Sequence, residues 1–210
     1  MKNPFPLIRQ CSQPCSAILV KLPITPNQIT TASLLLGVTG GIFFISSNFE
    51  TQLIGSFIFF LSYILDNCDG EVARYKNLTS SFGEEFDTFV DWIVHAFFFV
   101  TLGYGTWLET ENLIWLWVGL IASAGATINY FLVTFILKFK DCEDQTHGAK
   151  FDETMTQKII YIFREIFRSD FCFIVILLTI IDYHWLLLPA AAIGTQIYWI
   201  MALISHHSKK

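Results

Sequence analysis

The stretch from Leu65 to Asp91, LDNCDGEVARYKNLTSSFGEEFDTFVD, is a polar segment in a chain that is otherwise rich in apolar residues. The apolar stretches on both sides of it are close to the about 17 to 25 residues that a helix needs to cross a bilayer. The segment contains Asp66, Asp69, Asp87 and Asp91. An aspartate inside a membrane costs about 2.5 to 3.5 kcal/mol even on a lenient insertion scale, so this cluster indicates a functional site.

The composition excludes a soluble domain of this length. Of 210 residues, 53% are hydrophobic and only 15% charged, and 21 are Phe. We therefore expect an all-α integral membrane protein that forms a single domain over residues 1–210, with a bundle of six transmembrane helices within residues 26–210. The expected spans, taken from the apolar runs, are Ile29–Ser46, Leu53–Cys68, Phe86–Tyr104, Leu113–Leu137, Phe171–Ile181 and Trp185–Ile204.

The distribution of charge predicts the orientation of these spans. With six spans and both termini inside, all 13 Lys and Arg residues lie on one side of the membrane. The opposite loops hold Glu50, Glu109, Glu111 and Asp182 and no basic residue. Because Lys and Arg are retained on the cytoplasmic side, we expect a multi-pass membrane protein whose aspartate cluster faces the cytoplasm.

Residues 1–25 lack the compact apolar stretch of a secretory signal, because basic residues and prolines are interspersed along them. We expect an interfacial arm or a short amphipathic helix here. The first span then begins with a capping-box pattern: Thr25 is the N-cap, Pro26 takes the first helical position, and Gln28 follows three residues after the cap.

The spacing of the aspartates predicts a metal site. Asp66 and Asp69 are three residues apart near the end of the second span, and Asp87 and Asp91 are four apart at the start of the third. Each pair therefore lies on one face of its helix, and a turn over 75–82 would let the two faces meet. Such oxygen donors suit Mg²⁺ or Mn²⁺, and two ions about 3.5 to 4 Å apart could be held in this way.

The residues around the aspartates suggest a phosphate-bearing ligand. Gly70, Ala73 and Gly83 leave room for a bulky ligand or a neighbouring backbone, and Arg74 offers a positive fork that matches phosphate oxygens. A metal site with these residues suggests a pyrophosphate. The alternative is an ion-pair network in which Arg74 neutralises one aspartate, but one Arg among four acids leaves an excess of negative charge that a cation would remove.

The same segment resembles the CDP-alcohol phosphotransferase (CDP-alcohol phosphatidyltransferase) family of integral membrane enzymes, which make phospholipids and related phosphodiesters. Its pattern matches the family signature without a gap: Asp66-x2-Asp69-Gly70-x2-Ala73-Arg74-x8-Gly83-x3-Asp87-x3-Asp91. The start of the first span, Pro26-Asn27-x-Ile29-Thr30, is also similar to that family. With the six-span layout, the resemblance covers most of the chain.

The resemblance implies that an acceptor hydroxyl attacks the β-phosphorus of a CDP-alcohol and releases CMP. Family roles then place Asp66, Asp69 and Asp87 as metal ligands, and Asp91 as a further ligand or the general base. The residues that would bind the CDP-alcohol are Asn27, Thr30, Gly70, Ala73, Arg74 and Gly83.

The resemblance also implies partners and a location. We expect a CDP-alcohol donor, a lipid or soluble alcohol acceptor, membrane lipids, a second copy of the chain in a homodimer, and no nucleic acid. Glycines such as Gly37 and Gly40 in the first span would permit close helix packing. The cell membrane of a bacterium or archaeon is the expected location.

Three further residues have two interpretations each. Arg164 and Arg168, at the cytoplasmic mouth of the fifth span, could hold an anionic acceptor or serve only as positive-inside anchors. His95, one turn beyond Asp91 on the same helix face, could tune that carboxylate or touch substrate, or it could be a hydrogen-bonded histidine of the bundle.

Trp92 differs from the resembled family, because many of its lipid-making members have Arg or Lys at this position.

Three functions remain open from the sequence. The first is a transferase that uses CDP-diacylglycerol in phospholipid synthesis, and the second is the same chemistry with a soluble CDP-alcohol such as CDP-inositol. The third, from another class, is a divalent-cation transporter, since aspartates within the membrane can also mark an ion path. A transporter needs acids along the depth of the membrane, whereas these cluster at one face beside an Arg, which favours the enzyme.

Overall fold

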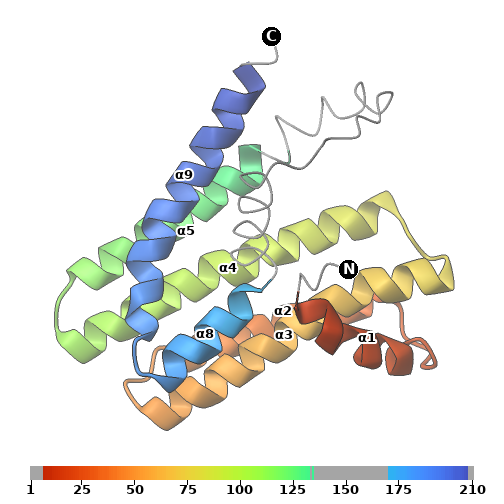
Figure 1. Cartoon of the computed structure of the whole chain (residues 1–210), viewed down its shortest axis with the longest axis horizontal. Coiled ribbons are helices and arrows are strands. Elements are labelled where there is room, and N and C mark those ends of the chain that lie inside the picture. The colour runs from red at the N-terminus through yellow and green to blue at the C-terminus, as the bar shows by residue number, and fades with distance from the viewer. Residues whose placement is uncertain (1–6, 133, 135–169, 208–210) are drawn as a thin grey trace, which may run out of the picture.

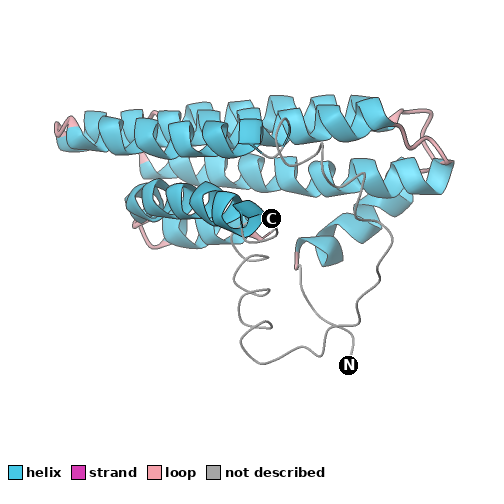
Figure 2. Cartoon of the chain, turned by 90° about the horizontal axis from the view of Figure 1, so that it is seen from above, coloured by secondary structure: helices cyan, strands magenta, loops and turns pink. Residues whose placement is uncertain are grey.

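The computed structural model describes residues 7–132, 134 and 170–207, and every regular element within them is a helix (Figures 1 and 2). The elements, in chain order, are α1 (Ile8–Leu19), α2 (Pro26–Phe43), α3 (Phe49–Lys76), α4 (Ser81–Thr110), α5 (Ile114–Phe131), α8 (Phe171–Ile180), the short 3₁₀ helix η2 (His184–Leu186) and α9 (Leu187–His207). The all-α class is confirmed for the part of the chain described here.

Three of these helices, α3, α4 and α5, are long and apolar enough to cross a membrane, and α8 is a shorter apolar helix. Helices lie at the positions of the other expected spans too, with α2 close to the first, α8 at the fifth and η2 with α9 at the sixth. The count of six spans remains a prediction. The second span was expected to end at Cys68, but α3 continues to Lys76 and carries the polar signature residues with it.

Capping explains where the helices around the polar segment begin and end. The capping box of α2 is confirmed, because the Thr25 backbone N–H donates to Gln28 Oε1 at 2.9 Å and Gln28 N–H donates to Thr25 Oγ1 at 3.4 Å. Asn77 ends α3 in the left-handed region at φ 55°, and the Ser80 hydroxyl accepts a hydrogen bond from Gly83 N–H at 3.1 Å at the start of α4. The connection between α3 and α4 is therefore only 77–80, shorter than the expected turn over 75–82.

Close helix packing places α2 against both α3 and α4. A Cβ on Gly40 would lie 2.9 Å from the backbone N of Phe59, and one on Gly37 would lie 2.7 Å from the methyl groups of Val94. The absence of a side chain at these positions lets the backbones approach, as expected from the sequence. Figure 1 shows α3 and α4 running side by side in opposite directions, with α5 and α9 crossing them at an angle.

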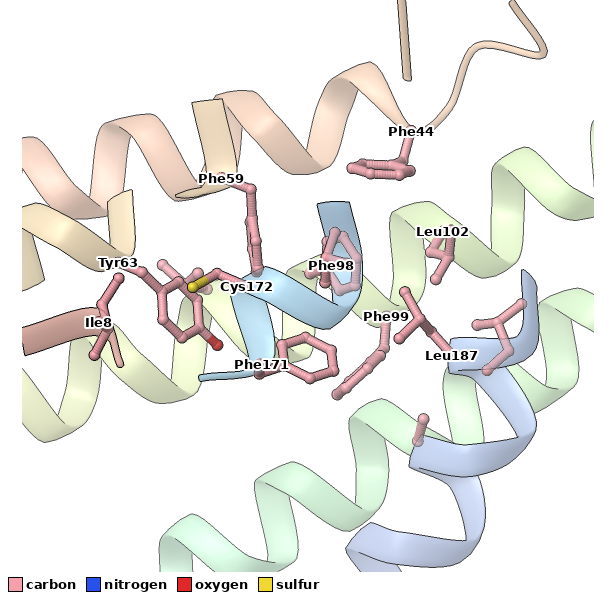
Figure 3. Packing of buried hydrophobic residues seen from close by; sticks show 14 of the residues in the cluster. Ile8, Phe44, Phe59, Tyr63, Phe98, Phe99, Leu102, Phe171, Cys172 and Leu187 are labelled. Carbon is pink, nitrogen blue, oxygen red and sulfur yellow. The ribbon is translucent and has the colours of Figure 1, made fainter. Parts of the chain in front are cut away.

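Aromatic side chains fill the interior between these helices. Phe59 of α3 and Phe98 of α4 have ring centroids 4.5 Å apart, and Phe98 lies edge-on to Phe44 at 5.2 Å (Figure 3). Phe171, the first residue of α8, contacts Phe98 at 6.0 Å. The resulting core joins the end of α2 to α3, α4 and α8.

The N-terminal arm contains a helix that packs on α3. The buried side of α1 consists of Ile8, Ser12 and Ser16. Its first backbone groups are capped from far along the chain, because the Asp170 carboxylate accepts from Leu7 N–H and Ile8 N–H, both at 2.9 Å. The expected position of this arm at the membrane surface remains a prediction.

The acidic loops gather at the end of the bundle away from the aspartates. Buried His184 lies with Nε2 3.8 Å from Glu109 Oε2 and Nδ1 3.9 Å from Asp182 Oδ1. The end of α4 therefore meets the α8–α9 connection, as the charge distribution predicts. Burial lowers the pKa of His184 below its ordinary value, and the charge of Asp182 opposes that shift.

Gly105 provides a test of the close packing of α2 on α4. A Cβ at this position would lie 1.9 Å from the carbonyl oxygen of Phe44, so we expect Gly105→Ala to destabilise the fold by about 1 to 3 kcal/mol, because backbone must move. The matched control is Gly194→Ala in α9, where a Cβ meets nothing within 4 Å and the change should be neutral or stabilising by at most about 1 kcal/mol. Thermal unfolding of the purified protein in detergent measures both. Equal unfolding temperatures for the two variants would contradict the packing.

Candidate active site

The polar signature occupies one face of α3. Because α3 is unbroken to Lys76, Asp66, Asp69, Gly70 and Ala73 follow at helical spacing and line the same side of it. Asp87 and Asp91 lie on the first turns of α4, which returns from the short 77–80 connection. The two predicted aspartate pairs are thus brought to the same end of the bundle.

Asp66 is the centre of the acidic cluster. It lies within electrostatic range of Asp91, Asp87 and Asp69, and its carboxyl group is within hydrogen-bonding distance of that of Asp87. Among the residues that the structure describes, no three His, Cys, Asp or Glu side chains converge closely enough to surround one cation. The donor set nevertheless consists of carboxylate oxygens alone, which is the chemistry that a hard divalent cation requires.

Asp69 is held by partners on two helices. Its side chain is 5% exposed, and the Thr30 hydroxyl of α2 donates to its Oδ2 atom. The Gly70 backbone also hydrogen-bonds the carboxylate, and Arg74 lies within electrostatic range. Thr30, expected as a residue that binds the CDP-alcohol, therefore orients a predicted metal ligand in this structure.

The remaining residues predicted to bind a CDP-alcohol lie around these carboxylates. Arg74 is exposed and folds back along its helix, since a Cβ on Gly70 would lie 3.4 Å from one of its terminal nitrogens. A Cβ on Gly83 would lie 3.4 Å from Asn27 Oδ1, so the start of α4 lies beside the start of α2. The missing side chain at Gly70 lets the Arg74 guanidinium lie against α3, and the missing side chain at Gly83 lets Asn27 lie against α4.

Tyr63, which the sequence analysis did not single out, forms the inner boundary of the site. Its hydroxyl lies 2.6 Å from His95 Nε2, and His95 Nδ1 lies 2.7 Å from the backbone oxygen of Asp91. Of the two interpretations of His95, the hydrogen-bonded histidine of the bundle is the one that the structure shows. No sequence motif marks Tyr63, because its partner is on another helix.

Of three other residues considered in the sequence, Trp92 has structural partners, and the other two lie outside the described residues. The Trp92 indole N–H donates to Thr127 Oγ1 at 3.0 Å, and its ring stacks on Tyr130 with centroids 4.8 Å apart, so Trp92 joins α4 to α5. Arg164 and Arg168, the predicted acceptor-binding residues, lie outside the described residues.

The chain is similar to known proteins over most of its length. The family model described as CDP-alcohol phosphatidyltransferase matches residues 23–205. A bifunctional IPC transferase and DIPP synthase of Thermococcus kodakarensis is 34% identical over 122 residues, which are 58% of this chain and 26% of that protein. A CDP-diacylglycerol–serine O-phosphatidyltransferase of Helicobacter pylori is 37% identical over 91 residues, 40% of this chain and 37% of that protein. The matched regions thus cover well under half the length of these two relatives.

The Thr30 contact can be tested without assuming any reaction. Thr30→Val keeps the shape of the side chain but removes the donor to a buried carboxylate, so we expect a destabilisation of about 1 to 3 kcal/mol. Thr31→Val is the matched control, since the exposed Thr31 hydroxyl donates to Asn27 O of its own helix at 2.8 Å. Thermal unfolding in detergent near neutral pH compares them. Equal losses in both variants would show that Thr30 does not hold Asp69.

Proposed function

The chain belongs to the CDP-alcohol phosphatidyltransferase family, and from this premise we propose that it transfers a substituted phosphate group from CDP-diacylglycerol to an acceptor hydroxyl in phospholipid synthesis. The observation that carries the proposal is the arrangement of the complete signature on facing ends of α3 and α4. Membership in an enzyme family weighs against the cation transporter.

The proposed reaction forms one bond and breaks one bond at the β-phosphorus of the donor. An oxygen of the acceptor forms a bond to the β-phosphorus of the donor, the bond from that phosphorus to the CMP oxygen breaks, and the acceptor loses its hydroxyl proton. We assign the proton to the Asp91 carboxylate, which lies near the other aspartates without being fully buried. CMP leaves with the bonding electron pair.

The chemistry of the carboxylates also supports a divalent ion. Asp66 lies among three other carboxylates, while the nearby basic side chain, Arg74, is exposed. We propose that the four aspartates hold Mg²⁺ or Mn²⁺, as one ion or two. When bound, the ion would neutralise negative charge that develops on the departing CMP.

The surroundings of the aspartates suit the diphosphate of the donor. The Arg74 guanidinium can offer two parallel N–H groups to phosphate oxygens, and it lies against Gly70, where no side chain intervenes. Asn27, beside Gly83, provides polar groups at the start of α2. Ala73 continues the small-residue face of α3, so a nucleotide can approach the helix closely.

A soluble CDP-alcohol such as CDP-inositol is the second candidate donor. The likeness to the Thermococcus kodakarensis IPC transferase and DIPP synthase supports it, while the likeness to the Helicobacter pylori serine enzyme supports CDP-diacylglycerol. The proposed orientation places the site on the cytoplasmic side of a bacterial or archaeal cell membrane, following the distribution of Lys and Arg. The homodimer remains a prediction.

CMP release by the purified full-length chain in lipid nanodiscs with Mg²⁺ tests the function. CDP-diacylglycerol or CDP-inositol is supplied with serine, glycerol 3-phosphate, inositol phosphate or phosphatidylglycerol. We expect acceptor-dependent CMP with CDP-diacylglycerol. Release with CDP-inositol alone would establish the second donor, and the absence of both CMP and donor binding would contradict the transferase.

Replacing single carboxylates tests the metal assignment. Asp69→Asn or Asp87→Asn should lower the rate of CMP release by on the order of 100-fold or more, because an amide is a poor ligand for a hard cation at a site that stabilises developing charge. The matched control is Glu84→Gln, the same loss of charge at an exposed position in the first turn of α4. Near-normal rates in both aspartate variants would rule out this assignment.

The proposed contact between the Arg74 guanidinium and the CDP-alcohol can be tested separately. Arg74→Lys keeps the positive charge but loses the paired N–H groups, so we expect the KM for the CDP-alcohol to rise about 10-fold with a smaller change in the KM for the acceptor. Arg9→Lys, at an exposed position of α1, is the control. An unchanged donor KM in the Arg74 variant would place the guanidinium outside the donor site.

A further inference from the structure

The two helices that carry the aspartate pairs meet mainly through side chains, such as Phe59 and Phe98, rather than through close approach of their backbones. Both α3 and α4 pack extensively on α2, whereas they approach each other closely at few points. The distance between Asp66 and Asp91 therefore depends on α2 and on the side chains that connect α3 to α4 below the site.

A hydrogen bond between Tyr63 and His95 makes that connection one helical turn inside the site. Tyr63 precedes Asp66 by three residues and His95 follows Asp91 by four, so each lies on the face of its helix that carries the aspartate. The Tyr63 hydroxyl is 2.6 Å from His95 Nε2. The phenol is also within electrostatic range of both Asp91 and Asp66.

The hydrogen-bonding partners of His95 determine its tautomer. The backbone oxygen of Asp91, 2.7 Å from Nδ1, can only accept, so Nδ1 carries the proton. With a neutral ring, Nε2 then has a lone pair and accepts from the Tyr63 hydroxyl. The chain of donors runs in one direction, from the Tyr63 phenol on α3 through His95 to the backbone of Asp91 on α4.

Packing around this pair leaves little freedom for either ring. Tyr63 is 6% exposed and contacts Phe59 with centroids 5.2 Å apart. Phe171 of α8 lies against the His95 ring at 5.9 Å. Figure 3 shows Tyr63 among Phe59, Phe171 and Cys172. The hydrogen bond is partly buried, and the reduced access of water strengthens it.

We propose that Tyr63 and His95 are positioning residues, which set the separation of the Asp66 and Asp91 carboxylates and so align them for the transfer reaction. This inference rests on the proposed function, because it assigns a purpose to the distance between two carboxylates of that site. Small displacements of catalytic groups reduce turnover more than binding. Loss of the hydrogen bond between Tyr63 and His95 should therefore lower kcat.

Kinetics of CMP release separate positioning from simple stabilisation of the fold. We expect Tyr63→Phe to lower kcat about 10-fold and to leave the KM for the donor within about twofold. His95→Leu should lower kcat similarly, and the double variant should be no worse than either single one, because all three lack the same bond. His95→Gln keeps an acceptor for the Tyr63 hydroxyl and should recover part of the rate. The matched control, Tyr104→Phe, removes a half-exposed hydroxyl elsewhere in α4 and should change nothing.

A merely structural role predicts a different result. In that case Tyr63→Phe would lower the unfolding temperature while kcat per folded molecule stayed normal, and the effects of Tyr63→Phe and His95→Leu would add. Either observation would overturn the proposal.

The hydrogen bond between Tyr63 and His95 can be detected by NMR without any substrate. In protein labelled with ¹⁵N-histidine, the ring signals that disappear in His95→Gln belong to His95, one of five histidines. We expect Nδ1 protonated and Nε2 unprotonated, with the Nε2 signal shifting in Tyr63→Phe. A protonated Nε2 at neutral pH would overturn the proposal whatever the turnover. If wild-type protein releases no CMP with any donor, the proposed function fails. The tautomer of His95 then still shows whether the hydrogen bond between Tyr63 and His95 exists.

Discussion

The placement of four carboxylates at one end of a membrane helix bundle is the constraint on which the rest of the structure depends. A buried carboxylate requires hydrogen-bond donors or positive charge close by. Asp69 obtains donors from the Thr30 hydroxyl and the Gly70 backbone, while Asp66 lies among three other carboxylates. The site therefore needs a third helix, α2, in contact with both aspartate-bearing helices.

The glycines of α2 make that arrangement possible. A methyl group on Gly37 or Gly40 would collide with Val94 of α4 or with the backbone of Phe59 on α3, so each glycine lets α2 approach one of the two helices. Within a membrane, apolar side chains gain little from leaving lipid, and close packing of this kind supplies much of the attraction between helices. The same contact brings Thr30 to Asp69 and Asn27 to Gly83, so packing and site geometry have one cause.

Much of this protein could be predicted from the sequence. The helical class, the capping box at Thr25 and the grouping of Asp66 with Asp91 follow from composition, local hydrogen bonding and helical spacing. The turn after the second span was predicted to begin at Tyr75, but α3 continues through Lys76 until Asn77 caps it. Hydropathy reports the surroundings of a segment, whereas the backbone conformation is ended by a residue that can adopt the left-handed region.

The sequence alone determined which residues we propose to carry the chemistry, since the signature has a fixed spacing and spacing along a helix sets the face. Only the tertiary structure decided what those residues contact. Thr30 reaches Asp69 across a separation of 39 residues, and Tyr63 reaches His95 across 32. Such pairs depend on how the backbones of three helices approach one another, which no local pattern encodes. The roles of Thr30 as an orienting donor and of Tyr63 as a tie between helices therefore emerged only with the packed bundle.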